Sequence, residues 1–84
     1  MKKIKLYTKD YCGFCNRAKK LLDDNGYEYE FEEIQDKPEV QEELIAKYGQ
    51  ESVPYVFIGD ELIGGNSDLQ KLFADGKLDE MLAD

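Results

Sequence analysis

The stretch Tyr11-Cys12-Gly13-Phe14-Cys15 holds the only two cysteines of the 84-residue chain, spaced as C-x-x-C. An alternating apolar segment at residues 4–7 precedes it, and a helical pattern follows it. The stretch is therefore predicted to lie where a strand ends and a helix begins. At a helix N-terminus, free backbone N–H groups and the helix dipole stabilise a thiolate. Cys12 is predicted to be the acidic, nucleophilic thiol, and Cys15, one turn later, to resolve the mixed disulfide formed at Cys12.

The cysteine pair has two other interpretations. Both thiols could be buried packing residues, since a free cysteine behaves as a small hydrophobic side chain. The polar residue Asp10 and the glycine Gly13 beside Cys12 make a poor setting for that role. The pair could also be half of a zinc site, which needs four ligands. The chain has no histidine and no further cysteine, so a Cys/His zinc site within one chain is excluded. Redox chemistry is favoured.

Length and composition predict one small domain over residues 1–84. No segment approaches the ~20 apolar residues that a membrane span needs. The N-terminus has charge but lacks the apolar run of a signal peptide. Two cysteines do not suit a disulfide-stapled secreted scaffold. These features predict a cytoplasmic protein whose disulfide is transient, with no membrane partner.

The charge of the chain is unevenly distributed. The formal net charge is −8, which argues against nucleic acid as a partner. Residues 1–22 nevertheless carry seven Lys or Arg and one acid, whereas residues 23–84 carry four Lys and eighteen acids. The sequence therefore predicts a basic region around the reactive thiol.

Hydrophobic periodicity predicts the first three elements. Alternation predicts strands over residues 2–7 and 27–32, and the glutamates of the second discourage edge-to-edge pairing. Between them, residues 13–25 are predicted to form a helix. The buried stripe of this helix is predicted to comprise Phe14, Ala18, Leu21 and Leu22.

The second half of the chain predicts two helices around a hairpin. Pro38 opens a helix that Gly49 ends. Residues 55–63 predict two strands joined by a tight turn. Asn66 or Ser67 is expected to cap a last helix, followed by a short amphipathic turn.

The order β-α-β-α-β-β-α predicts an α/β domain with a mixed four-stranded sheet flanked by helices. The first two strands should pair in parallel, because a helix joins them in a right-handed crossover.

Three features together resemble the glutaredoxin family. They are the C-x-x-C motif after the first strand, Val53-Pro54 before the third, and Gly64-Gly65-Asn66-Ser67-Asp68 before the last helix. The resemblance covers nearly the whole chain, and the Thr8-Lys9 lead-in narrows it to the glutathione-using branch. It implies the thioredoxin fold and a glutathione-dependent thiol–disulfide oxidoreductase.

The resemblance also implies roles for individual residues. Cys12 would be the nucleophile and Cys15 the resolving thiol. Val53, before a cis Pro54, would pair its backbone with the cysteinyl part of glutathione. The glycine carboxylate would be bound by Lys9 and Gln41, and the γ-glutamyl end by Asn66, Ser67 and Asp68. Tyr11 and Phe14 are either core aromatics or part of the cleft wall, and Tyr11 is included among the predicted glutathione-binding residues.

The sequence departs from the family pattern at two places. Gly13-Phe14 replaces the common Pro-Tyr and is more typical of one-cysteine members that carry iron–sulfur clusters. Gln50-Glu51 stand where a basic residue often precedes Thr-Val-Pro.

Three functions follow as hypotheses. The first is a monomeric enzyme that reduces glutathionylated proteins through Cys12 alone and protein disulfides through both cysteines, with electrons from glutathione and, ultimately, an NADPH-dependent reductase. The second is a dimer that binds or transfers a [2Fe–2S] cluster held by one Cys12 per subunit and two glutathiones; apart from that cluster, no metal is expected. The third is an electron donor to ribonucleotide reductase that depends on thioredoxin reductase.

Overall fold

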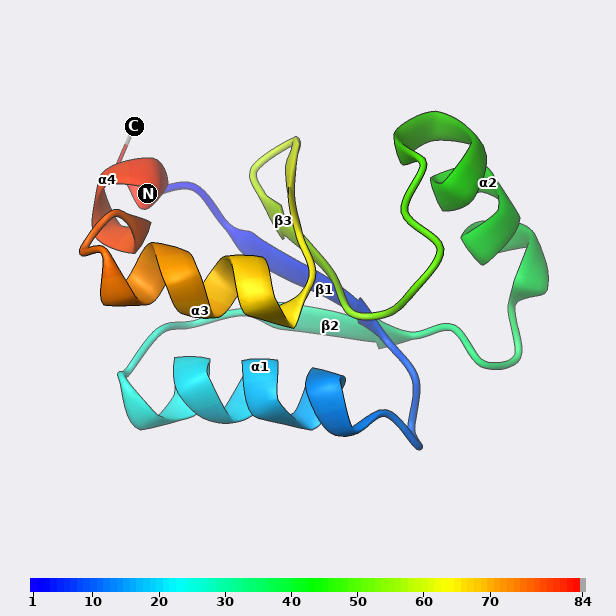
Figure 1. Ribbon diagram of the computed structural model, residues 1–84, viewed down its shortest axis with the longest axis horizontal. Coiled ribbons are helices and arrows are strands. Elements are labelled where there is room, and N and C mark those ends of the chain that lie inside the picture. The colour runs from blue at the N-terminus through cyan, green and yellow to red at the C-terminus, as the bar shows by residue number, and fades with distance from the viewer. Residues whose placement is uncertain (84) are drawn as a thin grey trace.

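A mixed four-stranded sheet in the order β2-β1-β3-β4 forms the centre of the computed structural model, which describes residues 1–83. β1 pairs in parallel with β2 and antiparallel with β3, and β3 pairs antiparallel with β4 (Figure 1). The strands are β1 (Ile4–Thr8), β2 (Glu30–Glu33), β3 (Tyr55–Ile58) and β4 (Glu61–Gly64). The helices are α1 (Gly13–Asp24), α2 (Pro38–Tyr48), α3 (Asn66–Ala74) and α4 (Leu78–Leu82). The predicted fold class is confirmed.

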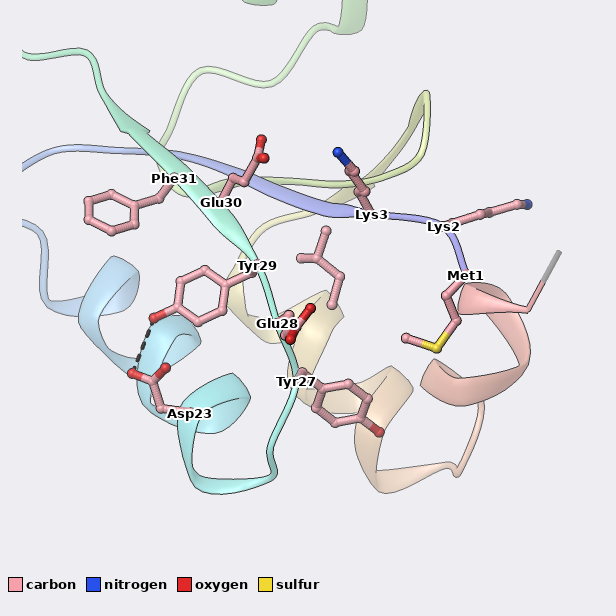
Figure 2. A pocket seen from close by; sticks show the side chains of 10 residues that line it. Met1, Lys2, Lys3, Asp23, Tyr27, Glu28, Tyr29, Glu30 and Phe31 are labelled. Carbon is pink, nitrogen blue, oxygen red and sulfur yellow. Dashed lines mark hydrogen bonds between the residues drawn. The ribbon is translucent and has the colours of Figure 1, made fainter.

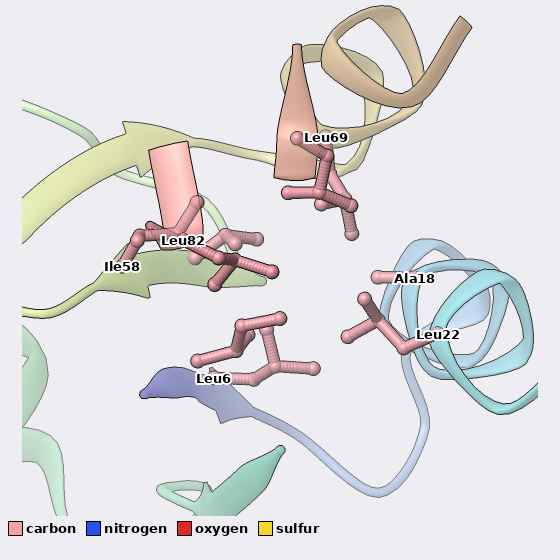
Figure 3. Packing of buried hydrophobic residues seen from close by; sticks show 9 residues of the cluster. Leu6, Ala18, Leu22, Ile58, Leu69 and Leu82 are labelled. Atoms are coloured by element: carbon pink, nitrogen blue, oxygen red, sulfur yellow. The ribbon is translucent and has the colours of Figure 1, made fainter. Parts of the chain in front are cut away.

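The larger hydrophobic core lies between the sheet and the helices α1, α3 and α4. Strand residues alternate between the two faces of a sheet. Ile4 and Leu6 of β1 therefore share one face, where Val56 and Ile58 of β3 join them. The helices complete this core with Ala18, Leu22, Leu69, Leu78 and Leu82 (Figure 3). The core fixes α1 and α3 against the same face of the sheet, so their N-termini meet the loops at one end.

The opposite face of the sheet is covered by α2. Tyr55 and Phe57, the alternate residues of β3, pack there with Ile34 and Leu44. The ring of Phe57 also meets that of Tyr48 edge to face, with centroids 5.3 Å apart. As predicted, α2 begins at Pro38 and is stopped by Gly49, its C-cap, whose φ of 77° is left-handed. The loop that leads from α2 into β3 is thereby placed beside the end of β1.

The second strand begins later than the sequence predicts. Residues 27–29 lie outside β2, and Tyr27 still belongs to the cap that ends α1. Gly26 has a φ of 76°, and the Tyr27 N–H donates to the Leu22 carbonyl at 2.9 Å, the pattern of a Schellman cap. The chain must leave this cap before it can pair with β1. The first strand likewise begins at Ile4 rather than at residue 2.

The C-terminal amphipathic turn is a separate helix, α4. The Lys2 N–H donates to the Leu82 carbonyl at 2.8 Å, so α4 lies against the start of the chain (Figure 1). None of the helices within residues 1–83 has the length and apolar character to cross a membrane.

Candidate active site

Cys12 is the N-cap of α1, at the end of the sheet where β1 stops. The backbone of Cys12 is extended, with φ −102° and ψ 112°, and its sulfur accepts a hydrogen bond from the Cys15 N–H at 3.1 Å. That N–H is one of the donors that a helix leaves free in its first turn. The side chain of Cys12 is half-buried, so it can meet a substrate. The predicted position of the thiol between strand and helix is confirmed.

Cys15, in contrast to the half-buried Cys12, is an inaccessible thiol. Its side chain is fully buried on the core side of α1. Burial, together with a hydrogen bond to Cys12, raises the pKa of the Cys15 thiol to about 12. Both cysteines are free thiols. Cys15 therefore remains protonated near neutral pH, one helical turn after the half-buried Cys12.

The loop before β3 supplies the second wall of the site. The Val53–Pro54 peptide bond is cis, as the resemblance implied. The Cys12 thiol lies 3.8 Å from the Val53 carbonyl and donates to it. Gln41, on α2, is half-buried, and its Nε2 donates to the Glu51 carbonyl at 3.1 Å. One of its two amide protons is thus used to hold this loop.

The third wall is the start of α3. Its N-cap is Gly65, not Asn66 or Ser67 as predicted, because the Asp68 carboxylate reaches back and accepts the Gly65 N–H at 3.0 Å. Gly64 has a φ of 132°, and a Cβ there would collide with this carboxylate. A Cβ on Gly65 would lie 3.7 Å from the carbonyl oxygen of Pro54, so the start of α3 lies next to the cis-proline loop.

The side chains predicted for this third wall differ in exposure. Asn66 is half-buried, and its Oδ1 accepts from Gln70 at 3.1 Å. Ser67 and Asp68 are exposed. All three lie at the N-terminus of α3, where the helix dipole favours an anion.

Two aromatic side chains beside the thiol point into solvent. Tyr11 is 75% exposed and Phe14 is 59% exposed. The prediction that Phe14 belongs to the buried stripe of α1 is wrong. Cys15 takes that inward position, and the guanidinium of Arg17 lies over the Phe14 ring, 5.4 Å from its centroid. The two exposed rings form an apolar border beside Cys12.

The predicted basic region is divided by the fold. Lys2 and Lys3 precede β1, a strand of about 15 Å, and lie at the other end from the thiols. There they border a shallow depression of about 790 Å³ that Tyr29 and Phe31 also line (Figure 2). The cations on α1 or in the loop that leads to it are Lys9, Arg17, Lys19 and Lys20. The prediction of a single basic region around the thiol is wrong for the N-terminal lysines.

The family model described as Glutaredoxin matches residues 4–63, which include both cysteines and the cis-proline loop. The chain belongs to the glutaredoxin family. It is 39% identical over 83 residues to the Glutaredoxin of Pseudomonas aeruginosa, with 99% of each chain covered. It is also 39% identical over 82 residues to Glutaredoxin 3 of Escherichia coli K12, covering 98% of this chain and 99% of that protein.

Solved glutaredoxin structures superpose closely on this chain. A buckwheat glutaredoxin–glutathione complex matches with a TM-score of 0.90 and 39% identity, covering 96% of this chain and 76% of that one. The holo form of glutaredoxin C1 from Populus tremula x tremuloides matches with a TM-score of 0.90 and 33% identity, covering 96% and 83%. The thioredoxin fold is thereby confirmed. Glutaredoxins are generally thiol–disulfide oxidoreductases.

A metal site within one glutaredoxin chain is not supported by its side chains. Within residues 1–83, no group of three or more His, Cys, Asp or Glu is placed to hold a metal ion. A [2Fe–2S] cluster needs four thiolates, and Cys12 is the one cysteine whose side chain is accessible. A single chain therefore does not fit the cluster, and the dimeric arrangement stays a prediction.

We expect iodoacetamide to label Cys12 and to spare Cys15 in the native protein. Alkylation requires a thiolate, and Cys15 is both buried and protonated, since its pKa is raised to about 12. At pH 7.5 the labelling rates should differ at least about a hundredfold. Mass spectrometry of tryptic peptides would measure them, with protein unfolded in denaturant as the control in which both cysteines react alike. Equal labelling of the native thiols would contradict the assignment.

Proposed function

We propose that this glutaredoxin is a glutathione-dependent oxidoreductase that reduces glutathione mixed disulfides and protein disulfides. The observation that carries the proposal is the half-buried Cys12 sulfur, which accepts the Cys15 N–H at 3.1 Å and lies 3.8 Å from the Val53 carbonyl. The first contact stabilises a thiolate at a helix N-terminus. The second brings peptide backbone beside that thiolate, where the cysteinyl part of glutathione can pair.

On a glutathionylated protein, Cys12 suffices for the reaction. Its thiolate attacks the glutathione sulfur, the protein thiolate leaves, and a Cys12–glutathione disulfide forms. A glutathione thiolate then attacks the glutathione sulfur of this intermediate. The products are oxidised glutathione and the Cys12 thiolate, so one free glutathione is consumed, and the other half of the oxidised glutathione is the glutathionyl group taken from the substrate.

On a protein disulfide, Cys15 is also needed. Cys12 attacks one substrate sulfur and releases the other as a thiolate, which takes up a proton. Cys15 then gives up its proton and attacks the Cys12 sulfur, which releases the second substrate thiol and leaves a Cys12–Cys15 disulfide. Two glutathione molecules then reduce this disulfide and form oxidised glutathione.

The charges of glutathione match the three walls of the site. Glutathione carries two carboxylates and one ammonium at neutral pH. Lys9, half-buried three residues before Cys12, can bind one carboxylate, with the Gln41 amide as the further donor that the family resemblance implies. The first N–H groups of α3, near Asn66 and Ser67, can bind the other. Asp68 can face the ammonium, and Tyr11 can cover the bound tripeptide. The 39% identical buckwheat glutaredoxin, which was solved as a complex with glutathione, supports this ligand.

Steady-state turnover of a glutathionylated peptide, with glutathione and glutathione reductase, tests the proposal. We expect turnover that depends on glutathione concentration and shows ping-pong kinetics, because Cys12 carries a covalent intermediate. Turnover supported by thioredoxin reductase but not by glutathione would instead favour the thioredoxin-reductase-dependent electron donor.

Lys9→Gln is expected to raise KM for the glutathionylated peptide several-fold. A partly exposed charge pair contributes up to ~1 kcal/mol, so a larger effect is not expected. The increase should shrink as salt is added, because exposed charges are screened. Lys2→Gln is the matched control, since Lys2 lies at the other end of β1. Equal small effects of the two substitutions on KM would show that Lys9 acts only through the overall electrostatic field of the protein.

Location and assembly remain predictions. A monomer in the cytoplasm fits the proposed reaction, with disulfide-containing or glutathionylated proteins as partners. The colour of anaerobically purified protein distinguishes the cluster-bound dimer, which would be brown.

A further inference from the structure

The loop of residues 50–54, between α2 and β3, is held by side chains. All five of its backbone carbonyls accept hydrogen bonds from side chains. Four of these donors come from Tyr55, Gln41 and Gln50, and they bind the carbonyls of residues 50, 51, 52 and 54. The fifth carbonyl, that of Val53, faces the Cys12 thiol. The loop thus presents to the reactive sulfur the one carbonyl that no amide or hydroxyl holds.

The Gln50 side chain binds the residues on both sides of Val53. Its Nε2 lies 2.9 Å from the Ser52 carbonyl oxygen and 3.0 Å from that of Pro54, the residues on either side of Val53. A glutamine amide has two N–H donors, so both are used. Since both partners are acceptors, only the nitrogen of the amide fits this position. A charged donor at this position would add charge to the site, whereas the neutral amide of Gln50 does not.

Gln50 is itself anchored to the core. The Tyr55 hydroxyl donates to the Gln50 carbonyl at 2.6 Å, and Tyr55 is fully buried. Burial raises the pKa of Tyr55, so the hydroxyl remains a donor at neutral pH. The anchor is rigid because Tyr55 packs with Ile34 and Leu44 beneath α2. The buried Tyr55 therefore fixes the Gln50 backbone. The Gln50 side chain in turn holds the carbonyls on either side of Val53.

We propose that Gln50 is a positioning residue that holds the Val53 backbone at the distance from Cys12 at which the cysteinyl part of glutathione docks. The inference rests on the proposed function. The positioning effect of Gln50 extends to the start of α3, because the Pro54 carbonyl that accepts from Gln50 lies next to Gly65. Gln50 was not among the residues predicted to act in the site, because a glutamine before Val-Pro gives no local signal of a role.

The test is Gln50→Met, which keeps the length of the side chain and removes both donors. With a glutathionylated peptide as substrate, KM should rise about tenfold, because the part-buried Pro54 carbonyl and the exposed Ser52 carbonyl both lose their partner and the loop is freed. The kcat should change by less than about twofold, because Cys12 and Cys15 are untouched. Gln50→Asn keeps the amide but shortens its reach, so it should raise KM by a smaller factor, about threefold. If Gln50→Met does not fold, the KM of Gln50→Asn still tests the proposal.

Asn25→Ala is the control for stability. It removes another amide-to-carbonyl bond, from Asn25 to Leu21 at 2.8 Å, at the far end of α1. It should lower Tm, by less than Gln50→Met because it removes one exposed bond rather than two bonds, and leave KM unchanged. An unchanged KM in both Gln50 variants, or a KM increase in Asn25→Ala that tracks Tm, would overturn the positioning role while the proposed function stands. Failure of the unsubstituted protein to turn over the peptide would overturn the proposed function and this inference with it.

Discussion

Cys12→Ser is expected to abolish turnover of both substrate classes, with kcat/KM lower by at least about a thousandfold, or ~4 kcal/mol. A serine hydroxyl is not ionised near neutral pH and cannot form the disulfide intermediate on which both reactions depend. Cys15 cannot replace it, because that thiol is buried and its pKa is raised to about 12. Assays with a glutathionylated peptide and with a protein disulfide would measure the loss.

The fold should survive this substitution, which makes the result interpretable. Cys12 occupies the N-cap of α1, and serine is among the preferred residues at that position. Circular dichroism and Tm should therefore match those of the unsubstituted protein or show a slight gain. A residual activity of several per cent in folded Cys12→Ser would show that Cys15 can act as a nucleophile, contrary to the assignment.

Cys15→Ser is expected to separate the two reactions. Turnover of a glutathionylated peptide should stay within about threefold, because a second glutathione can clear the Cys12 intermediate without a resolving thiol. Turnover of a protein disulfide should fall at least about a hundredfold, since the mixed disulfide between Cys12 and the substrate then has no internal thiol to resolve it.

Stability is the control for Cys15→Ser, because the substituted side chain is fully buried. A hydroxyl in that place costs about 1–2 kcal/mol unless it finds a hydrogen bond, so Tm should fall by several degrees. Assays well below that Tm remove the effect of unfolding. An equal loss on both substrates in folded protein would give Cys15 a role other than resolution.

Much of the fold could be predicted because its signals are local. Pro38 and Gly49 bound α2 as predicted, since proline suits the first turn of a helix and glycine a left-handed end. The alternation in the first strand correctly placed Ile4 and Leu6 on one face, and both lie in the larger core. The late start of β2 could not be predicted, because the Tyr27–Leu22 bond that ends α1 uses residues that also alternate like a strand.

The candidate site also has features that local sequence signals predict and features that they do not. The C-x-x-C spacing and its place between strand and helix are local, so the sequence by itself determined which thiol is exposed to the helix dipole and which lies one turn inside. The Cys12–Val53 contact joins residues 41 positions apart, and only the packing of β3 beside β1 creates it. The same packing turns Gln50 toward the carbonyls that flank Val53, whereas the extended β1 alone carries Lys2 to the far end from the motif. Helix and turn signals act over a few residues, whereas the distances between loops depend on how the sheet is ordered, and that order decided the walls of this site.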